Sequence, residues 1–388
     1  MGKVLIRETA GTQAVPFLRG ILTRSLQGSG LSFEQAYRIA SEVRSELSHS
    51  GEDREISSQE LRKMVGDYLG GAMGGVAAER YMALAIPPST IYVLTEDGRR
   101  TPFSRARHQH FLEPCCITSD AAGAISAKVY EHLLKMGSME IPSSEIRTIT
   151  SRYLKEDIDS KAAQRYLKWS RFVHSNRPLL VMIGGTAGCG KSTIATELAH
   201  RLDIVRIQST DMLREVMRMM VPKRMVPALH TSSFRAWEVL PQGRGVQPEL
   251  DEMLANGYRT QAELLSVACE GAVQRALQER VPLILEGVHI YPGLLQRLPS
   301  AEDALIVPLT LGVLKPDELR GRLKGRSKDA PDRRSKRYLK YFDNIWRLQS
   351  YLLSEADKAG VPIILNDDKE TAMQDVMRTI IDQLKDET

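Results

Sequence analysis

The stretch "LLVMIGGTAGCGKSTIATELAHRL", residues 179 to 202, decides the fold of the second half of this chain. An apolar run leads into four glycines, a lysine and two hydroxyl residues, and then into a segment with helical spacing. A buried strand, a turn of bare backbone and a helix N-terminus, in this order, form a binding site for phosphate. The stretch therefore predicts a phosphate-binding loop between a strand at 179–183 and a helix at 191–202.

This loop fits the Walker A pattern, Gly-x-x-x-x-Gly-Lys-Ser, in the strand-to-helix context that the pattern requires. Glycines let the backbone wrap around phosphates and turn its N–H groups inward. We expect Lys191 to place its charge on the β- and γ-phosphates of ATP and Ser192 to bind Mg²⁺. A chance match in a glycine-rich turn is the alternative, and the flanking strand and helix disfavour it. The predicted nucleotide-binding loop comprises Gly185, Thr186, Ala187, Gly188, Cys189, Gly190, Lys191, Ser192 and Thr193.

Length and composition indicate a globular protein of two or three domains, because 388 residues exceed the usual size of one domain. The formal net charge of +5 is modest for this length and gives no reason to expect nucleic acid as a partner. No apolar stretch approaches the roughly 20 residues of a membrane span, and the start "MGKVLIRETAG" lacks the core of a signal peptide. Four cysteines without metal-ligand spacing favour a reducing, cytoplasmic location and no membrane partner.

The first half of the chain contains a repeat. The segment "TQAVPFLRGIL" at 12–22 is echoed by "GRRTPFSRARH" at 98–108, an offset of 86. Further on, "ISSQELRKMVGDYL" at 56–69 matches "IPSSEIRTITSRYL" at 141–154, an offset of 85. Each copy reads as a short strand and turn followed by amphipathic helices, and the serine pairs are predicted to cap the helices that carry Glu60 and Glu145 in their first turns. We expect three domains, at 1–88, 89–174 and 175–388.

Each copy of the repeat resembles the ATP-cone, a small regulatory nucleotide-binding module at the N-terminus of several nucleotide-dependent enzymes. The resemblance covers 3–84 well and 91–170 more loosely, because the second copy has drifted to His108-Gln109-His110 and to Cys115-Cys116. It implies a regulatory nucleotide at the N-terminal module. Helical periodicity carries no ligand information, so two packing modules without a ligand stay an open alternative, favoured for the second copy.

The strand predicted after the phosphate loop ends in Ser209-Thr210-Asp211, at the edge where open parallel sheets bind ligands. There Asp211 is expected to accept a proton from a substrate hydroxyl or to hold the water shell of the metal. A plain helix N-cap is the alternative for Asp211. Arg214 falls on the same helical face, and with Arg218 it would suit an anionic substrate.

A third apolar run, "VPLILEGVHI" at 281–290, ends in Glu286 and His289. Glu286 stands where Walker B carboxylates occur, which predicts a role in binding Mg²⁺ or substrate. A buried ion pair with an arginine is its alternative. For His289, substrate binding competes with the role of a hydrogen-bonded residue behind the site, which we favour.

A basic segment follows the next strand: residues 315 to 340 contain eleven lysines and arginines against four acidic residues. A solvated basic face and a nucleic-acid site are both alternatives, but next to a phosphate loop a lid that closes over the transferred phosphoryl group is the better interpretation. Arg322 and Arg326, one helical turn apart, are the predicted catalytic arginines. The last strand ends at Asn366, where related folds place the loop that grips the nucleotide base.

Strands alternating with helices predict an α/β fold, a P-loop kinase parallel sheet flanked by helices and preceded by mainly α-helical ATP-cone-like domains. The order "GGTAGCGKST", "STDMLREVMR", "LILEGVHIYPG", "RYLKYFDNIWRLQSYL" resembles the 2-phosphoglycerate kinase family over 1–84 and 175–388. The extra copy at 91–170 departs from the family pattern. The resemblance implies transfer of the γ-phosphoryl group of ATP to the 3-hydroxyl of 2-phosphoglycerate, which gives 2,3-bisphosphoglycerate.

Two alternatives stay open at the level of the sequence. A zeta-toxin-like kinase acting on a nucleotide sugar shares the strand-end aspartate and the arginine-bearing lid. A regulatory protein that senses ATP without catalysis is the other, although mere binding needs neither Asp211 nor an arginine-rich lid. The assembly of several copies into a homo-oligomer is also left open.

Overall fold

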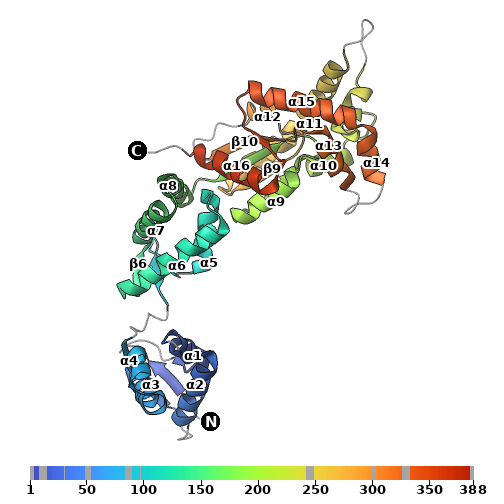
Figure 1. The fold of residues 1–388 in the computed structure, drawn as a ribbon. Coiled ribbons are helices and arrows are strands. Elements are labelled where there is room, and N and C mark those ends of the chain that lie inside the picture. Colours follow the sequence, from blue (N-terminus) through green and yellow to red (C-terminus); the bar gives the residue numbers. More distant parts are fainter. Residues whose placement is uncertain are drawn as a thin grey trace. The chain divides into compact units, whose positions relative to one another are not determined.

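The computed structural model describes residues 4–7, 15–29, 31–48, 54–83, 90–96, 98–241, 249–298, 303–325 and 333–384. The chain forms two compact units, Met1–Thr90 and Ile91–Thr388, and each is described by itself (Figure 1). Among the described residues, no helix combines the length and the apolar character needed to cross a lipid bilayer.

The first unit, which we call the first module, wraps helices around a small sheet with the strand order β2-β1-β3. Strand β1 is antiparallel to β2 and parallel to β3. Apolar residues at helical spacing in α1, α2 and α3 meet in one core, with Leu26, Val43 and Leu69 completely buried. The elements are β1 (Val4–Arg7), β2 (Val15–Pro16), α1 (Arg19–Gly28), α2 (Phe33–Leu47), β3 (Arg54–Ser57), α3 (Ser58–Met73) and α4 (Gly75–Ala83).

The second unit begins with a module of the same topology, residues 91–175, which we call the second module. Its sheet has the order β5-β4-β6, with one antiparallel and one parallel pair, the same arrangement as in the first module. The strands β3 and β6 were not expected from the sequence. The elements are β4 (Tyr92–Leu94), β5 (Arg100–Pro102), α5 (Arg105–Leu112), η1 (Glu113–Cys115), α6 (Ser119–Met136), β6 (Glu140–Pro142), α7 (Ser143–Asp157) and α8 (Ser160–His174).

The predicted serine caps are right in one copy and wrong in the other. Ser57 caps α3 in a capping box with Glu60: the hydroxyl accepts from the Glu60 N–H and the carboxylate accepts from the Ser57 N–H. The N-cap of α7 is Pro142, which makes no side-chain cap hydrogen bond. Proline stands at the position aligned with Ser57 and has no hydroxyl, so Ser143 falls inside the helix.

Residues 176–388, which we call the sheet domain, contain a five-stranded parallel sheet with the order β11-β10-β7-β9-β8. This confirms the predicted α/β class with a strand before the phosphate loop. The strands are β7 (Leu179–Gly184), β8 (Ile207–Ser209), β9 (Leu283–Glu286), β10 (Leu305–Gly312) and β11 (Ile363–Leu365). The helices are α9 (Lys191–Arg201), α10 (Thr210–Met220), η2 (Pro227–His230), η3 (Ser233–Val239), α11 (Leu250–Gln278), α12 (Pro292–Leu295), α13 (Pro316–Gly325), α14 (Arg333–Lys340), α15 (Phe342–Lys358) and α16 (Lys369–Asp382).

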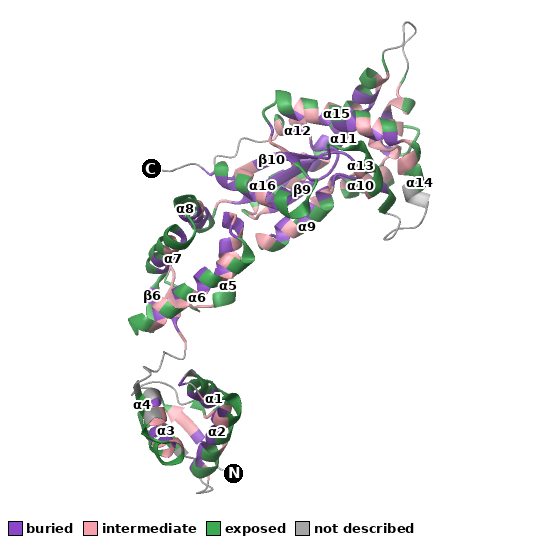
Figure 2. Ribbon diagram, viewed as in Figure 1, coloured by how far each residue is buried: buried purple, intermediate pink, exposed green. Residues whose placement is uncertain are grey.

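Both faces of the sheet are covered, and every residue of the central strands β7 and β9 is buried (Figure 2). Figure 1 shows α9 and α16 on one side of the sheet and α11 and α15 on the other. Along β7, Val181 and Ile183 belong to a core with residues of α9 and α16, whereas Leu180 and Met182 belong to a second core with residues of α11. The alternation of side chains along a strand therefore fixes β7 at the centre of the domain.

The second module and the sheet domain share one hydrophobic core. Leu112 and Trp169 of the module lie in the same buried cluster as Met373 and Met377 of α16. The Cys116 thiol, which follows η1, lies 3.7 Å from the Gln374 carbonyl oxygen of α16. The second module is therefore packed as part of the second unit.

Candidate active site

The phosphate loop is braced from the far end of the sheet domain. The Asn366 amide, which follows β11, donates a 2.8 Å hydrogen bond to the Cys189 carbonyl oxygen and is almost completely buried. Gly190 has φ +89°, and a Cβ there would stand 2.3 Å from the Asn366 nitrogen. Only glycine fits this position, so Asn366 supports the loop backbone through its side chain.

Lys191 opens α9 directly after this turn. Its Nζ donates a 2.7 Å hydrogen bond to the Thr186 carbonyl oxygen, and the side chain is buried. The Thr186 hydroxyl oxygen is buried and has no hydrogen-bond partner within the described residues. A buried ammonium and a buried hydroxyl at a helix N-terminus are groups that a phosphate satisfies.

Ser192 and Glu286 meet at the carboxyl edge of the sheet. The Ser192 hydroxyl donates a 3.0 Å hydrogen bond to Glu286 Oε1, and Glu286 is 5% exposed. Glu286 ends β9 and is paired with Ile183 of β7, which brings the carboxylate beside the phosphate loop. A hydroxyl and a carboxylate are hard oxygen donors, so this pair fits Mg²⁺. Among the described residues, Glu286 hydrogen-bonds to this serine and forms no ion pair with an arginine.

Asp211 and Arg214 lie together on the first turn of α10. The N-cap of this helix is Ser209, whose hydroxyl accepts from the Asp211 N–H, so Asp211 is not the cap. The Asp211 carboxylate is 65% exposed, and its Oδ1 lies 3.3 Å from Nη2 of Arg214. Arg214 also donates a 2.8 Å hydrogen bond to the Thr231 carbonyl oxygen. Arg218, one turn on, pairs with Glu215 at 2.6 Å.

His289 lies behind these residues and is 1% exposed. Its Nδ1 is 3.0 Å from the Thr210 hydroxyl and its Nε2 is 3.0 Å from Gln261 Oε1. Burial lowers the pKa of His289 to about 3, so the ring is neutral. Because both ring nitrogens are engaged, the geometry favours a hydrogen-bonded residue behind the site, as expected, over direct substrate binding.

Two arginines of the basic segment, Arg322 and Arg337, lie at different parts of the site. Arg322 of α13 pairs with Glu318 and donates to the Asn366 carbonyl oxygen beside the phosphate loop. Arg326, the second predicted catalytic arginine, lies outside the described residues. Arg337 of α14 was not singled out from the sequence, and it donates a 2.6 Å hydrogen bond to the Ser232 hydroxyl. Ser232 follows Thr231, the residue that anchors Arg214, so Arg337 reaches the neighbourhood of Asp211.

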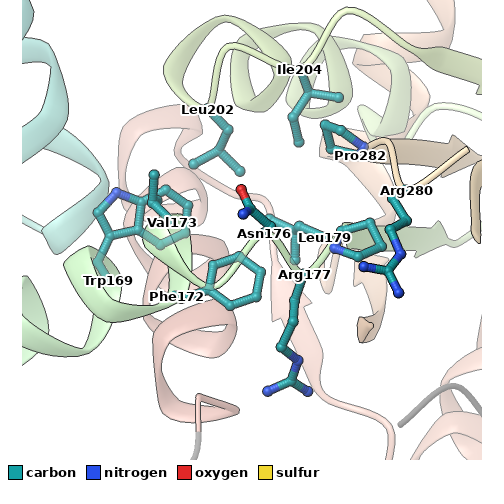
Figure 3. A pocket seen from close by; sticks show the side chains of 11 residues that line it. Trp169, Phe172, Val173, Asn176, Arg177, Leu179, Leu202, Ile204, Arg280 and Pro282 are labelled. Carbon is teal, nitrogen blue, oxygen red and sulfur yellow. The ribbon is translucent and has the colours of Figure 1, made fainter. Parts of the chain in front are cut away.

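A cavity of about 310 Å³ lies at the opposite edge of the sheet, where the strands begin (Figure 3). It is lined by Trp169 and Phe172 of α8 and by Leu179, the first residue of β7. The phosphate loop follows the other end of β7. The cavity is therefore separate from the candidate active site.

A Walker A loop, strand-end carboxylates and a set of arginines at the carboxyl edge of a parallel sheet define a P-loop kinase. The chain is 34% identical to the 2-phosphoglycerate kinase of Pyrococcus furiosus, over 76% of this chain and 96% of the relative. It is also 34% identical to the 2-phosphoglycerate kinase of Methanothermobacter thermautotrophicus, over 72% of this chain and 90% of the relative. The chain belongs to the 2-phosphoglycerate kinase family. It is an ATP-dependent phosphotransferase with an alcohol group as acceptor.

A family model described as "ATP cone domain" matches residues 91–175. This reverses the expectation that the first copy is the better ATP-cone. The relatives account for about three quarters of this chain. Among solved structures, a putative kinase from Chloroflexus aurantiacus aligns with 52% of this chain and 98% of its own, at 17% identity and a TM-score of 0.30.

Proposed function

We propose that this kinase phosphorylates the free hydroxyl of 2-phosphoglycerate with ATP and forms 2,3-bisphosphoglycerate. The observation that carries the proposal is the match to curated 2-phosphoglycerate kinases over 96% of the length of one of them. The chemistry of the site agrees with it. An acceptor with a phosphate and a carboxylate needs cations beside the aspartate that receives its hydroxyl proton, and Arg214 lies next to Asp211.

In the proposed reaction the acceptor oxygen forms a bond to the γ-phosphorus while the bond from that phosphorus to the β–γ bridging oxygen breaks. Asp211 orients the acceptor hydroxyl and takes its proton as the new bond forms. Lys191 exchanges its hydrogen bond to the Thr186 carbonyl for the β- and γ-phosphate oxygens. Catalysis consists mainly of alignment and neutralisation of charge.

We assign the metal site to Ser192 and Glu286. When bound there, Mg²⁺ supplies positive charge to the β- and γ-phosphate oxygens. The Ser192 hydroxyl oxygen would bind the metal and could keep its hydrogen bond to Glu286, whose carboxylate would hold the metal or a water bound to it.

Three arginines are proposed to hold the phosphate and carboxylate of the acceptor: Arg214 and Arg218 from α10, and Arg337 from α14. Arg322 is proposed to act on the ATP side, because it lies against Asn366 at the phosphate loop. The ATP-cone match further supports a regulatory nucleotide in the second module.

A coupled assay of ADP release tests this function. Purified protein receives Mg·ATP and a panel of phosphorylated three-carbon acids and nucleotide sugars, and the product is identified by mass. We expect turnover with 2-phosphoglycerate and none for Lys191→Ala. Turnover with a nucleotide sugar alone would show that the protein is a kinase for a different acceptor. ATP binding without any turnover would favour a regulatory ATP sensor.

The role of Asp211 is tested in the same assay. Asp211→Asn removes the proton acceptor and keeps the shape, so kcat should fall by roughly two to four orders of magnitude with little change in ATP affinity. Asp251→Asn is a matched control, because Asp251 is equally exposed and also paired with an arginine. An unchanged kcat in Asp211→Asn would reduce this residue to a structural one.

A further inference from the structure

His289 connects α10, which carries Asp211 and Arg214, to Gln261 of α11. It lies three residues after Glu286, the end of β9, and reaches across to α10 on one side and to α11 on the other. The orientation of the ring is determined by its neighbours. Gln261 uses its amide nitrogen to donate to the carbonyl oxygens of Ala228 and Thr231, so its amide oxygen must face His289. That oxygen only accepts, so the proton of the neutral ring is on Nε2 and Nδ1 accepts from the Thr210 hydroxyl.

The Gln261 side of this network leads to Arg214. The Thr231 carbonyl oxygen accepts from the Gln261 amide at 3.1 Å and from Arg214 at 2.8 Å. Gln261 is completely buried, so the position of the Thr231 carbonyl depends on a side chain that His289 holds in place. His289 is thus two hydrogen bonds away from the carbonyl that anchors Arg214.

The Thr210 side leads to Asp211, the next residue. Thr210 is completely buried, and the backbone of Gly287 packs directly against it. Gly287 has φ +154°, and a Cβ there would stand 1.8 Å from the Thr210 hydroxyl oxygen. Only glycine fits this turn after β9, where the backbone packs against Thr210 at the start of α10, next to His289.

We propose that His289 is a positioning residue of the acceptor site, which fixes Asp211 through Thr210 and Arg214 through Gln261. This inference rests on the proposed function of Asp211 and Arg214. Among the charged groups that face the ring are Asp211, Arg214 and Lys191. The ring stays neutral during catalysis, and its two hydrogen bonds hold Thr210 and Gln261 in place.

Two variants separate the two arms. Asparagine keeps an acceptor where Nδ1 stands, so His289→Asn retains the Thr210 bond and loses the bond to Gln261. Glutamine keeps a donor where Nε2 stands, so His289→Gln does the reverse. We expect His289→Asn to raise the KM for the acceptor about tenfold and His289→Gln to lower kcat about tenfold, the effect of one lost hydrogen bond. The KM for ATP should change less than about twofold in both.

A matched pair of glutamines controls for loss of stability. Gln261 and Gln349 are both buried, and each bonds backbone groups, in the case of Gln349 those of Val313. Gln261→Met should raise the acceptor KM, whereas Gln349→Met should lower Tm and leave the acceptor KM unchanged. Equal changes of kcat and of both KM values in the two His289 variants, or no change in either, would overturn the proposal.

The test does not depend on the identity of the acceptor, because the variants are assayed with whichever compound the wild type phosphorylates. A wild type inactive on 2-phosphoglycerate would refute the proposed function alone. The network is then read by ¹⁵N NMR of labelled histidine, with His289→Asn to assign the signal. We expect a neutral ring with its proton on Nε2 from pH 5 to pH 9; a ring that titrates in this range overturns the inference.

Discussion

The first and second modules have one topology and two different relations to the rest of the chain. Both build a three-stranded sheet with one antiparallel and one parallel pair. The buried residues of the first module form a cluster confined to residues 4–81, whereas those of the second module join the cluster of the sheet domain. Two copies with the same sequence pattern can therefore pack differently. The residues on the outer surface of each copy decide what it packs against.

Their interiors differ at three aligned positions. At offsets of 86, 86 and 85, Leu22, Ala40 and Val65 of the first module correspond to His108, Ser126 and Thr150 of the second. All six are buried. The His108 ring nitrogens lie 2.9 Å from the Ser126 hydroxyl and 3.0 Å from the Thr150 hydroxyl. One module thus has an apolar contact between three helices where the other has a hydrogen-bonded one.

Truncation gives the largest expected difference between the modules. A chain of residues 91–388 should fold and keep the kcat of the full chain, since it contains every residue of the core that the second module shares with the sheet domain. A chain of residues 176–388 should be insoluble or inactive, because residues of α16 such as Met373 lose the apolar neighbours that bury them. Solubility, circular dichroism and the ADP-release assay decide this. An active 176–388 fragment would show that the shared core is dispensable.

A matched pair of leucines sharpens the comparison. Leu26 and Leu112 are aligned at an offset of 86, and both are completely buried. Each change to alanine should cost about 2–5 kcal/mol in the unit that contains it. Calorimetry and heat inactivation should show that Leu112→Ala lowers the temperature at which kinase activity is lost, whereas Leu26→Ala leaves it unchanged. Equal inactivation of both variants would contradict separate cores.

The sequence pointed to the residues that line the site more directly than to those that support them from behind. The phosphate loop from Gly185 to Ser192 was readable because glycines, lysine and hydroxyl stand at fixed spacing between a strand and a helix. Asp211 was readable because it stands at the start of a helix just after a strand, at the carboxyl edge of the sheet. Gln261 was missed because it lies far from the motifs in a helix of 29 residues. Its signal was a lone amide within the apolar positions of Tyr258, Ala262 and Leu265.

The ranking of the two modules was wrong for a physical reason. Helical periodicity reports which face is buried and not what it is buried against, so it could not distinguish a module with a core of its own from one that shares the core of the sheet domain. His108 looked like drift from a ligand-binding pattern. In the folded module it is a buried hydrogen-bonded residue.

The smallest expected effect concerns the polar contact at His108. Burial lowers the pKa of His108 from its ordinary value of 6.5 to about 4. In the unfolded chain the ring binds a proton near pH 6.5, and in the folded chain it does so only near pH 4. The stability of the second unit should therefore be complete above pH 6.5 and fall as the pH is lowered toward 4, by about 2–3 kcal/mol from this group.

Replacing these residues of the second module by their counterparts in the first should remove the pH-dependent loss of stability caused by His108. In the triple variant His108→Leu, Ser126→Ala, Thr150→Val the contact becomes apolar, and the loss of stability between pH 7 and pH 4.5 should shrink by about 2–3 kcal/mol relative to the wild type. Urea unfolding at the two pH values measures it. Tyr166 packs nearby, but burial raises its pKa to about 12, so it is silent in this range. An unchanged pH dependence would mean that His108 has the same pKa in the folded and unfolded chains, which would contradict a pKa lowered by burial.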